Sequence, residues 1–368
     1  MPSELHRLQT WFLGVIAFAV ILFLLVQAKF ILISFAIALM LFSLTSDAIS
    51  YLQKLRFGKA TLSVFLASLL AVTFIAAVLI FLSVLVLTQT NVVVSTVLQY
   101  AGPAREAVAE MFGWIGDDAE AAVLSWLSEV QIAPWLATVA GQAGNLASGA
   151  VLVILFIGFL FLERVWFSNK LENLLGDPER AARVMTIISS IVHRVNRYLV
   201  VKTVISSVTG ALVFLMMRLL GLELAFAMGV LTFVLNFIPN IGSIVATLVV
   251  SLVGYVQTGD HLTGLALLSV IGAIQFGIGQ VIEPLLLGNT LQLSSLGIIV
   301  SLAFWAAVWG VLGMFLAVPI MVSVMIICSH VPRLRPIAIL LSQKGLPDID
   351  DPLAATEKGD TDIPRKAA

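Results

Sequence analysis

Charged side chains are scarce in this chain of 368 residues, because Asp, Glu, Lys and Arg together make up only 11% of it. Apolar residues make up 60%, and the mean hydropathy is +1.08. A protein that folds in water needs a polar surface around its core, and this composition cannot supply one. The scarcity of charge therefore excludes a water-soluble globular fold and indicates that membrane lipid is the solvent.

An excess of one sign of charge is also missing, because 20 basic residues oppose 21 acidic ones. Without a global basic field, we expect no nucleic-acid partner. The only cysteine, Cys328, lies in an apolar run and can form no internal disulfide. We expect it to pack as a small apolar group.

Signatures of catalysis are missing as well. The four histidines, His6, His193, His261 and His330, lie far apart and have no carboxylates at metal-ligand spacing. We find no glycine-rich phosphate loop after a strand and no nucleophile elbow. The sequence predicts no enzyme activity, no metal and no cofactor.

Long apolar runs are abundant, and a helix needs about 20 apolar residues to cross the hydrocarbon core. Suitable runs occupy residues 11–28, 30–46, 60–88, 146–162, 203–220, 224–256, 262–282 and 296–330. The first run could imitate a signal peptide, but a second begins directly after Lys29, so we interpret it as an uncleaved helix. The pattern predicts an all-α integral membrane protein with about eight transmembrane segments.

Basic residues predict the orientation, because short loops rich in Lys and Arg stay on the cytoplasmic side. One such loop carries Lys54, Arg56 and Lys59. A second basic group comprises Arg164, Lys170, Arg180, Arg183, Arg194, Arg197 and Lys202. Residues 89–145 contain a single basic residue, Arg105, and are predicted to lie outside. Both termini are then cytoplasmic.

The predicted external stretch has amphipathic helical periodicity between Val108 and Val130, and Trp114, Trp126 and Trp135 are distributed along it. These helices either lie on the membrane surface or pack as a pair on the spans or on a neighbouring subunit. On the cytoplasmic side, Asp177 and Pro178 are typical of a helix start.

The helix that starts there has one apolar stripe, formed by Val184, Ile187, Ile188, Ile191 and Val195. Its basic residues lie off that stripe and either fix the topology or bind lipid headgroups. The chain turns polar and acidic after Pro347, which predicts a disordered tail.

The apolar region 224–256 is too long for one perpendicular crossing, and Pro239 and Gly242 interrupt it near the middle. Proline removes a helical hydrogen bond, so freed backbone groups can face a cavity. Transporters form sites from half-helices in this way. Asn236, Asn240 and Ser243 flank the break and are candidate pathway residues; alternatively, both asparagines bond to neighbouring helices beside a proline kink.

A polar stripe follows on the next run, with Gln275, Gln280 and Glu283 on one helical side. An ionisable residue near a span is expensive unless it faces protein or water, so Glu283 is a candidate for ion or proton coupling. Because Pro284 follows it, Glu283 could instead mark the headgroup boundary. The glycines Gly272 and Gly279 on this stripe either allow close helix approach or contact the substrate, and close approach is favoured.

The last apolar region, 296–330, is again too long and contains Gly310, Gly313 and Pro319. It predicts either a hairpin followed by a crossing helix or one long kinked helix. Together with Pro284, these three positions are candidate hinges. Two interrupted segments in one half of a membrane protein favour re-entrant elements that enclose a shared site.

Several motifs between Tyr198 and Pro319 resemble one known family. They are Arg197-Tyr198-Leu199 with Lys202-Thr203, the stretch from Leu235 to Gly242, Ile282-Glu283-Pro284 with Gly288, and the stretch Gly310 to Met314 with Ala317-Val318-Pro319. In this order and spacing they resemble the autoinducer-2 exporter (AI-2E) family. The resemblance implies a multi-span, homo-oligomeric protein of the bacterial inner membrane. It also implies export of a small hydroxylated signalling molecule or, as in some relatives, exchange of sodium for protons.

A neutral solute is favoured here, because carboxylates are nearly absent from the predicted span cores while amide side chains are present. A cation/proton antiporter is the first alternative, and a non-transporting scaffold that recruits partners through its external helices is the second. We expect membrane lipid and a small solute as partners, with a proton or sodium ion as a further candidate.

Five regions follow from these patterns. They are N-terminal spans (1–88), an external amphipathic region (89–146), a span with a basic cytoplasmic helix (147–202), a transport core (203–332) and a cytoplasmic tail (333–368). The working hypothesis is alternating access, in which the core moves around a site at Pro239.

Overall fold

The computed structural model describes residues 2–54, 64–110, 132–288 and 291–345, with a few further positions between 116 and 126. Within these residues the chain consists of helices and turns, apart from one isolated bridge between Leu293 and Ser342. The all-α class is therefore confirmed. The helices are α1 (Pro2–Gln27), α2 (Lys29–Lys54), α3 (Val64–Glu110), α5 (Ile132–Leu175), α6 (Pro178–Leu219), α7 (Ala225–Leu235), α8 (Ile241–Thr258), α9 (His261–Gly277), η2 (Ile278–Ile282), α10 (Glu283–Leu287), α11 (Ser295–Trp309), α12 (Val311–His330) and α13 (Arg335–Leu341).

Seven helical segments in the described part of the chain are long and apolar enough to cross a membrane, and three shorter apolar helices accompany them. The prediction of a multi-pass membrane protein is confirmed. The shorter helices include α7 and α11, each of which precedes an interruption predicted from the sequence.

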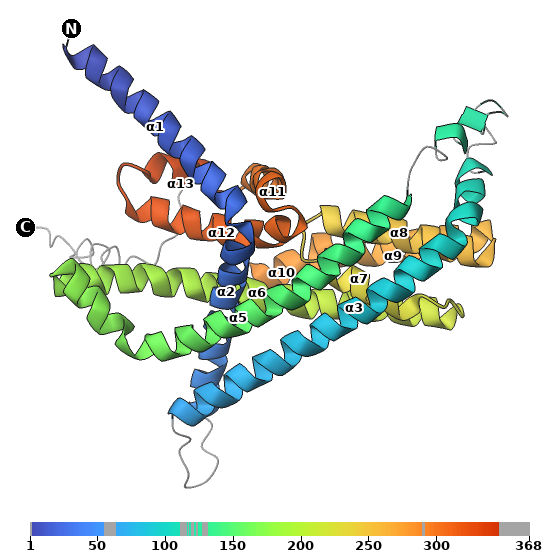
Figure 1. Ribbon diagram of the computed structural model, residues 1–368, viewed down its shortest axis with the longest axis horizontal. Helices are drawn as coiled ribbons and strands as arrows, with labels where there is room; N and C mark the ends of the chain where they lie inside the picture. Colours follow the sequence, from blue (N-terminus) through green and yellow to red (C-terminus); the bar gives the residue numbers. More distant parts are fainter. Residues whose placement is uncertain are drawn as a thin grey trace, which may run out of the picture.

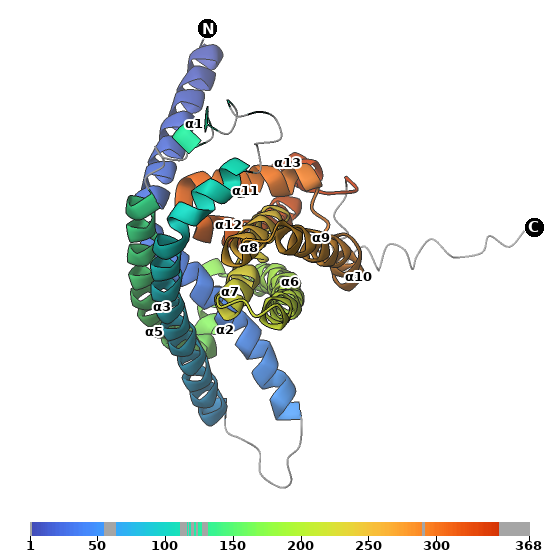
Figure 2. The same ribbon diagram turned by 90° about the vertical axis from the view of Figure 1, so that its right-hand side faces the viewer.

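The helices form two packed groups (Figures 1 and 2). In the first group, α3 and α5 lie side by side and α2 packs against them, around a core that includes Ala38, Ile75 and Ile157. In the second group, α6 to α12 pack on one another. A buried hydrogen bond joins the groups, because the Ser43 hydroxyl in α2 donates to the side-chain oxygen of Asn196 in α6 over 2.7 Å.

Helix α1 projects away from both groups, and most of its apolar side chains are exposed (Figure 1). Its C-terminal end is anchored, because the indole of Trp309 at the end of α11 donates to the Leu25 carbonyl over 3.0 Å. Exposed apolar surface of this kind needs lipid or another protein around it.

Helix α6 begins as predicted, with the Asp177 carboxylate accepting from the backbone amide of Glu179 at 2.9 Å and Pro178 in the first turn. The predicted apolar stripe faces the core, where Val195 is buried with Cys328. The packing predicted for Cys328 is confirmed. One expectation differed: the interfacial helix and the span predicted from Thr203 are one continuous helix of 42 residues. At a rise of about 1.5 Å per residue, α6 is roughly twice as long as the hydrocarbon core is thick.

Parts of the predicted organisation lie outside the described residues. These are the loop around Arg56 and Lys59, most of the external amphipathic stretch including Trp114, and the tail that follows Pro347. Within the described residues, α3 continues without interruption from the predicted span to Glu110, and α5 already begins at Ile132. The Trp126 side chain is exposed.

Candidate functional site

The first predicted interruption separates α7 from α8. Helix α7 ends at Leu235 and α8 begins at Ile241, so Pro239 lies in the turn between them. Asn240 adopts a positive φ of 60°, which reverses the chain direction locally. Gly242 is required for the close approach of the two arms, because a Cβ atom there would lie 1.7 Å from the Leu235 carbonyl oxygen. The break predicted at Pro239 is confirmed.

The second interruption separates α11 from α12 at Gly310, whose φ is 67°. The two arms form a hairpin, which the Ser301 hydroxyl in α11 ties by donating to the Ala317 carbonyl in α12 over 2.9 Å. Gly313 allows the close approach, since a Cβ atom there would lie 2.1 Å from the Trp305 carbonyl oxygen. Of the two predicted forms of region 296–330, the hairpin is the one observed, and Pro319 lies inside its second arm.

A third irregularity lies between α9 and α10, where η2 forms a turn of π-helix over Ile278–Ile282. Such turns insert an extra residue into a helix and occur often at functional sites. Glu283 follows directly as the first residue of α10, with Pro284 after it. The π-turn therefore determines the direction in which the Glu283 side chain leaves the helix.

That side chain reaches Lys202 in the middle of α6. The Lys202 ammonium nitrogen lies 2.6 Å from a Glu283 carboxylate oxygen, and the side chains are 2% and 19% exposed. Lys202 is the one charged residue among the buried residues in the described part of the chain. The two charges cancel, so this part of the core holds a polar pair with no net charge.

A third group joins this pair from the α7–α8 break. The Lys202 ammonium also donates to the backbone carbonyl of Asn236 over 3.3 Å. Asn236 is the C-cap residue of α7, and the C-terminal end of a helix carries partial negative charge that favours a nearby cation. The Asn236 side-chain amide is buried and donates to the Ser206 hydroxyl at 3.4 Å, one turn beyond Lys202. The ion pair thus joins α6, the end of α7 and the start of α10.

Three buried side chains in α6, α8 and α9 have polar atoms without a hydrogen-bond partner, namely Tyr198, Gln257 and Gln275. The Tyr198 hydroxyl lies one turn before Lys202 on α6, interacts electrostatically with Glu283 and has no hydrogen-bond partner. The side-chain nitrogen of Gln275 in α9, a predicted site residue, is also buried without a partner. Native proteins seldom leave such groups unsatisfied, so each of them needs an explanation.

The other predicted pathway residues lie elsewhere. Asn240 and Gln280 are exposed. Ser243 is half-buried, and its hydroxyl donates locally to the Asn240 carbonyl over 2.9 Å. Of the predicted polar residues, the structure brings Asn236 and Glu283 together, while the roles of Asn240, Ser243, Gln275 and Gln280 stay predictions.

Lys202 was predicted to belong to the basic group on the cytoplasmic side, and the structure shows that its side chain is buried in an ion pair. Two signals in the sequence pointed to another role. Apolar Val204 and Ile205 lie just after Lys202, and Lys202 falls in one of the motifs on which the resemblance to the AI-2E family rests. Tyr198 belongs to the same motif and was likewise not predicted as a site residue.

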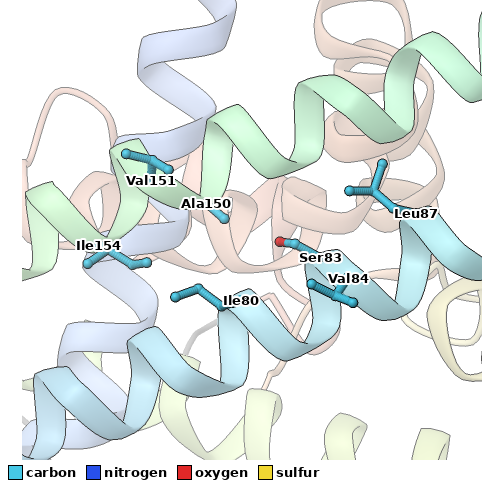
Figure 3. A pocket seen from close by; sticks show the side chains of 7 residues that line it. All are labelled: Ile80, Ser83, Val84, Leu87, Ala150, Val151 and Ile154. Atoms are coloured by element: carbon cyan, nitrogen blue, oxygen red, sulfur yellow. The ribbon is translucent and has the colours of Figure 1, made fainter.

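A separate cavity of about 260 Å³ lies between α3 and α5 (Figure 3). Its lining is apolar except for Ser83, whose hydroxyl donates to the Leu79 carbonyl of its own helix at 2.7 Å. The cavity offers a polar solute nothing to bind and suits a hydrocarbon chain. No group of three or more His, Cys, Asp or Glu side chains that could hold a metal ion occurs in the described part of the chain.

Comparison with known proteins places these features in a family. The model of the AI-2E family transporters matches residues 13–333. The AI-2 transport protein TqsA of Escherichia coli K12 is 34% identical over 207 residues, which cover 55% of this chain and 57% of that protein. A candidate transport protein of Borreliella burgdorferi is 30% identical over 57% of this chain and 58% of that protein. One of Haemophilus influenzae is 29% identical over 56% of this chain and 58% of that protein. The matched part thus spans little more than half the length of each of these relatives.

Proposed function

The chain belongs to the AI-2E family of transporters, and we propose that it exports a small, neutral, hydroxylated signalling molecule by alternating access. The related TqsA is named an AI-2 transport protein, which supports a solute of this class. Relatives from three bacteria support a bacterial membrane as the location, and we assign the inner membrane with both termini in the cytoplasm.

The observation that carries the proposal is the meeting of two helix irregularities at one buried polar cluster without net charge. The α7–α8 break contributes the Asn236 carbonyl, and the π-turn before α10 contributes Glu283. Interrupted helices around a polar cluster are how secondary transporters build solute sites. A cluster with no net charge suits a neutral solute, because a permanent ion would leave one charge uncompensated.

Within this proposal, the region 203–332 moves around the cluster. Asn236, Pro239, Gly242 and Ser243 belong to the solute pathway, with Asn240, Gln275 and Gln280 at its ends. The hinges are Pro284, Gly310, Gly313 and Pro319. Glu283 couples the movement to the binding of an ion or a proton. The exposed apolar faces of α1 and α3 support contact with lipid and with further copies of the chain.

A second candidate function is cation/proton exchange, and the ion pair itself favours it. A sodium ion that binds Glu283 leaves the Lys202 ammonium uncompensated in the core, unless Lys202 releases its proton. Cation binding and proton release would then be linked one to one. This candidate requires the same two residues but a different transported species.

Efflux of labelled autoinducer-2 from proteoliposomes tests the proposal. We expect the wild-type protein to exceed protein-free liposomes, and Asn240→Ala to reduce the flux at equal protein content. Sodium-driven pH changes in everted vesicles, without autoinducer-2 flux, would support the exchanger instead. Loss of cellular function on deletion of Val108 to Val130, with no transport by the intact protein, would support a scaffold.

A further inference from the structure

The Tyr198 hydroxyl is buried, unpaired and adjacent to the ion pair. Its residue is 2% exposed, and no donor or acceptor of the described chain lies within hydrogen-bond distance of the hydroxyl. Tyr198 and Lys202 are four residues apart on α6, so their side chains lie on the same face of the helix. An unsatisfied hydroxyl beside an ammonium and a carboxylate is a group that a polar ligand can satisfy.

The ion pair can open only if another group interacts with each of the two charges in place of its partner. Separating the charges in the core leaves an uncompensated ammonium on Lys202 and an uncompensated carboxylate on Glu283. A hydroxyl group both accepts and donates, so one hydroxyl of a ligand can accept from Lys202 while another donates to Glu283. A monovalent ion satisfies one side only.

The two partners differ in how firmly the fold holds them. Lys202 lies in the middle of α6, which crosses α7 closely: a Cβ atom on Gly210 would lie 2.7 Å from the Gly229 carbonyl oxygen. Glu283 lies between the π-turn and Pro284, in a five-residue helix that ends at Gly288 with φ 50°. This segment departs from regular α-helical hydrogen bonding, because the π-turn changes the bonding pattern and Pro284 has no amide proton to donate. Glu283 is therefore the partner that moves.

We propose that Tyr198, Lys202 and Glu283 form the recognition site for a neutral solute with at least two hydroxyl groups, and that this solute opens the ion pair by taking its place. The inference rests on the proposed function and adds to it the residues and the chemistry of recognition. Opening is linked to solute binding, because an empty open pair leaves two buried charges unsatisfied.

The sharpest test is Tyr198→Phe in the full chain, reconstituted in proteoliposomes with labelled autoinducer-2 as the probe. The substitution removes a hydroxyl that bonds to nothing in the protein, so the folded state keeps its stability. We expect the KM for efflux to rise about twofold to tenfold, the effect of losing one hydrogen bond to the ligand. We also expect autoinducer-2 to raise the melting temperature of the wild-type protein more than that of Tyr198→Phe.

The double variant Lys202→Met with Glu283→Gln removes both charges at nearly constant volume. Loss of charge-assisted hydrogen bonds to the solute should lower kcat/KM by about tenfold or more. The matched control is Lys170→Met with Glu163→Gln, which removes an exposed ion pair within α5 and should leave efflux unchanged.

The outcomes separate the two proposals. In one outcome the wild-type protein exports autoinducer-2, but the KM is unchanged in Tyr198→Phe and kcat/KM is unchanged in the double variant. This result would overturn the recognition site and leave the proposed function intact. If the wild-type protein moves no autoinducer-2, the proposed function and the recognition site fail together.

Discussion

Gly242, in the first turn of α8, packs directly against the backbone carbonyl of Leu235 in the last turn of α7. Gly313 has the same relationship to Trp305 in the α11–α12 hairpin. In both places a glycine near the start of the second arm lets the chain turn sharply without a side chain between the arms. Both interruptions therefore depend on the absence of one Cβ atom, which makes them sensitive to single substitutions.

Gly242→Ala should destabilise the protein by about 1–3 kcal/mol, the usual range for overpacking a tight site. The new Cβ atom would lie 1.7 Å from the Leu235 carbonyl oxygen, so the backbone of the turn must shift. Thermal unfolding in detergent measures the effect. Gly158→Ala in α5 is the control, because no atom lies within 4 Å of its added Cβ, and equal melting temperatures for the two variants would contradict this account.

Glu283→Gln should destabilise the protein by about 3–5 kcal/mol, because it leaves the buried Lys202 ammonium without its counter-charge. Adding Lys202→Met to the same chain should recover most of that loss, since a buried pair replaced as a whole is close to neutral in stability. Chemical unfolding of the single and double variants gives the comparison. Additive losses in the double variant would show that the two side chains are not coupled.

The sequence made the interruptions predictable but not the ion pair. Pro239, Gly242 and Gly310 act on the backbone beside them, so their effect is readable within a few residues. Lys202 and Glu283 are 81 positions apart, and their contact depends on how α6 packs against α10 and on a π-turn that leaves no clear trace in composition. Lys202 was grouped with the basic residues of the cytoplasmic side for the same reason, because only the packing shows that its side chain points inward.

The continuity of α6 was hidden for a related reason. Its N-terminal half is amphipathic and basic, and its C-terminal half is apolar, so the two halves have different patterns. A helix continues through such a change when no proline or glycine intervenes, and between Arg194 and Thr203 neither occurs. Composition predicted an interfacial helix and a span, and the structure shows one helix that covers both stretches.

Ser43→Ala should destabilise the protein by about 1 kcal/mol, the usual contribution of one buried neutral hydrogen bond. This hydroxyl donates to Asn196 and is a polar link between the α2–α3–α5 group and α6. Ser83→Ala is the matched control, because the Ser83 hydroxyl bonds only within its own helix. In chemical unfolding, Ser43→Ala should have a lower free energy of unfolding than the control. The reverse order would indicate that apolar contacts alone hold the two groups of helices together.

Asp260→Asn should lower the melting temperature at neutral pH and have little effect in acid. The Asp260 carboxylate caps the N-terminus of α9. It accepts hydrogen bonds from the Thr263 hydroxyl at 2.8 Å and from the backbone amides of Leu262 and Thr263 at 3.1 Å each. The hydrogen bond from the Thr263 hydroxyl is the main reason that the pKa of this carboxyl lies below its ordinary value of 3.8, and the bond from the Leu262 amide is the second. Because the folded-state pKa is the lower one, the carboxylate stabilises the fold fully above about pH 4 and loses this effect as the pH falls through the folded-state pKa.

The wild-type and Asp260→Asn proteins should therefore differ in melting temperature at pH 7 and converge below the folded-state pKa, where the carboxyl group is protonated in the folded protein. Asparagine is the right substitution for this test, because its side-chain oxygen still caps the helix while its charge does not change with pH. Melting curves from pH 7 down to a pH below the folded-state pKa measure the convergence. A difference that stays constant as the pH falls would mean that the stabilising effect of Asp260 does not depend on the charge of its carboxylate.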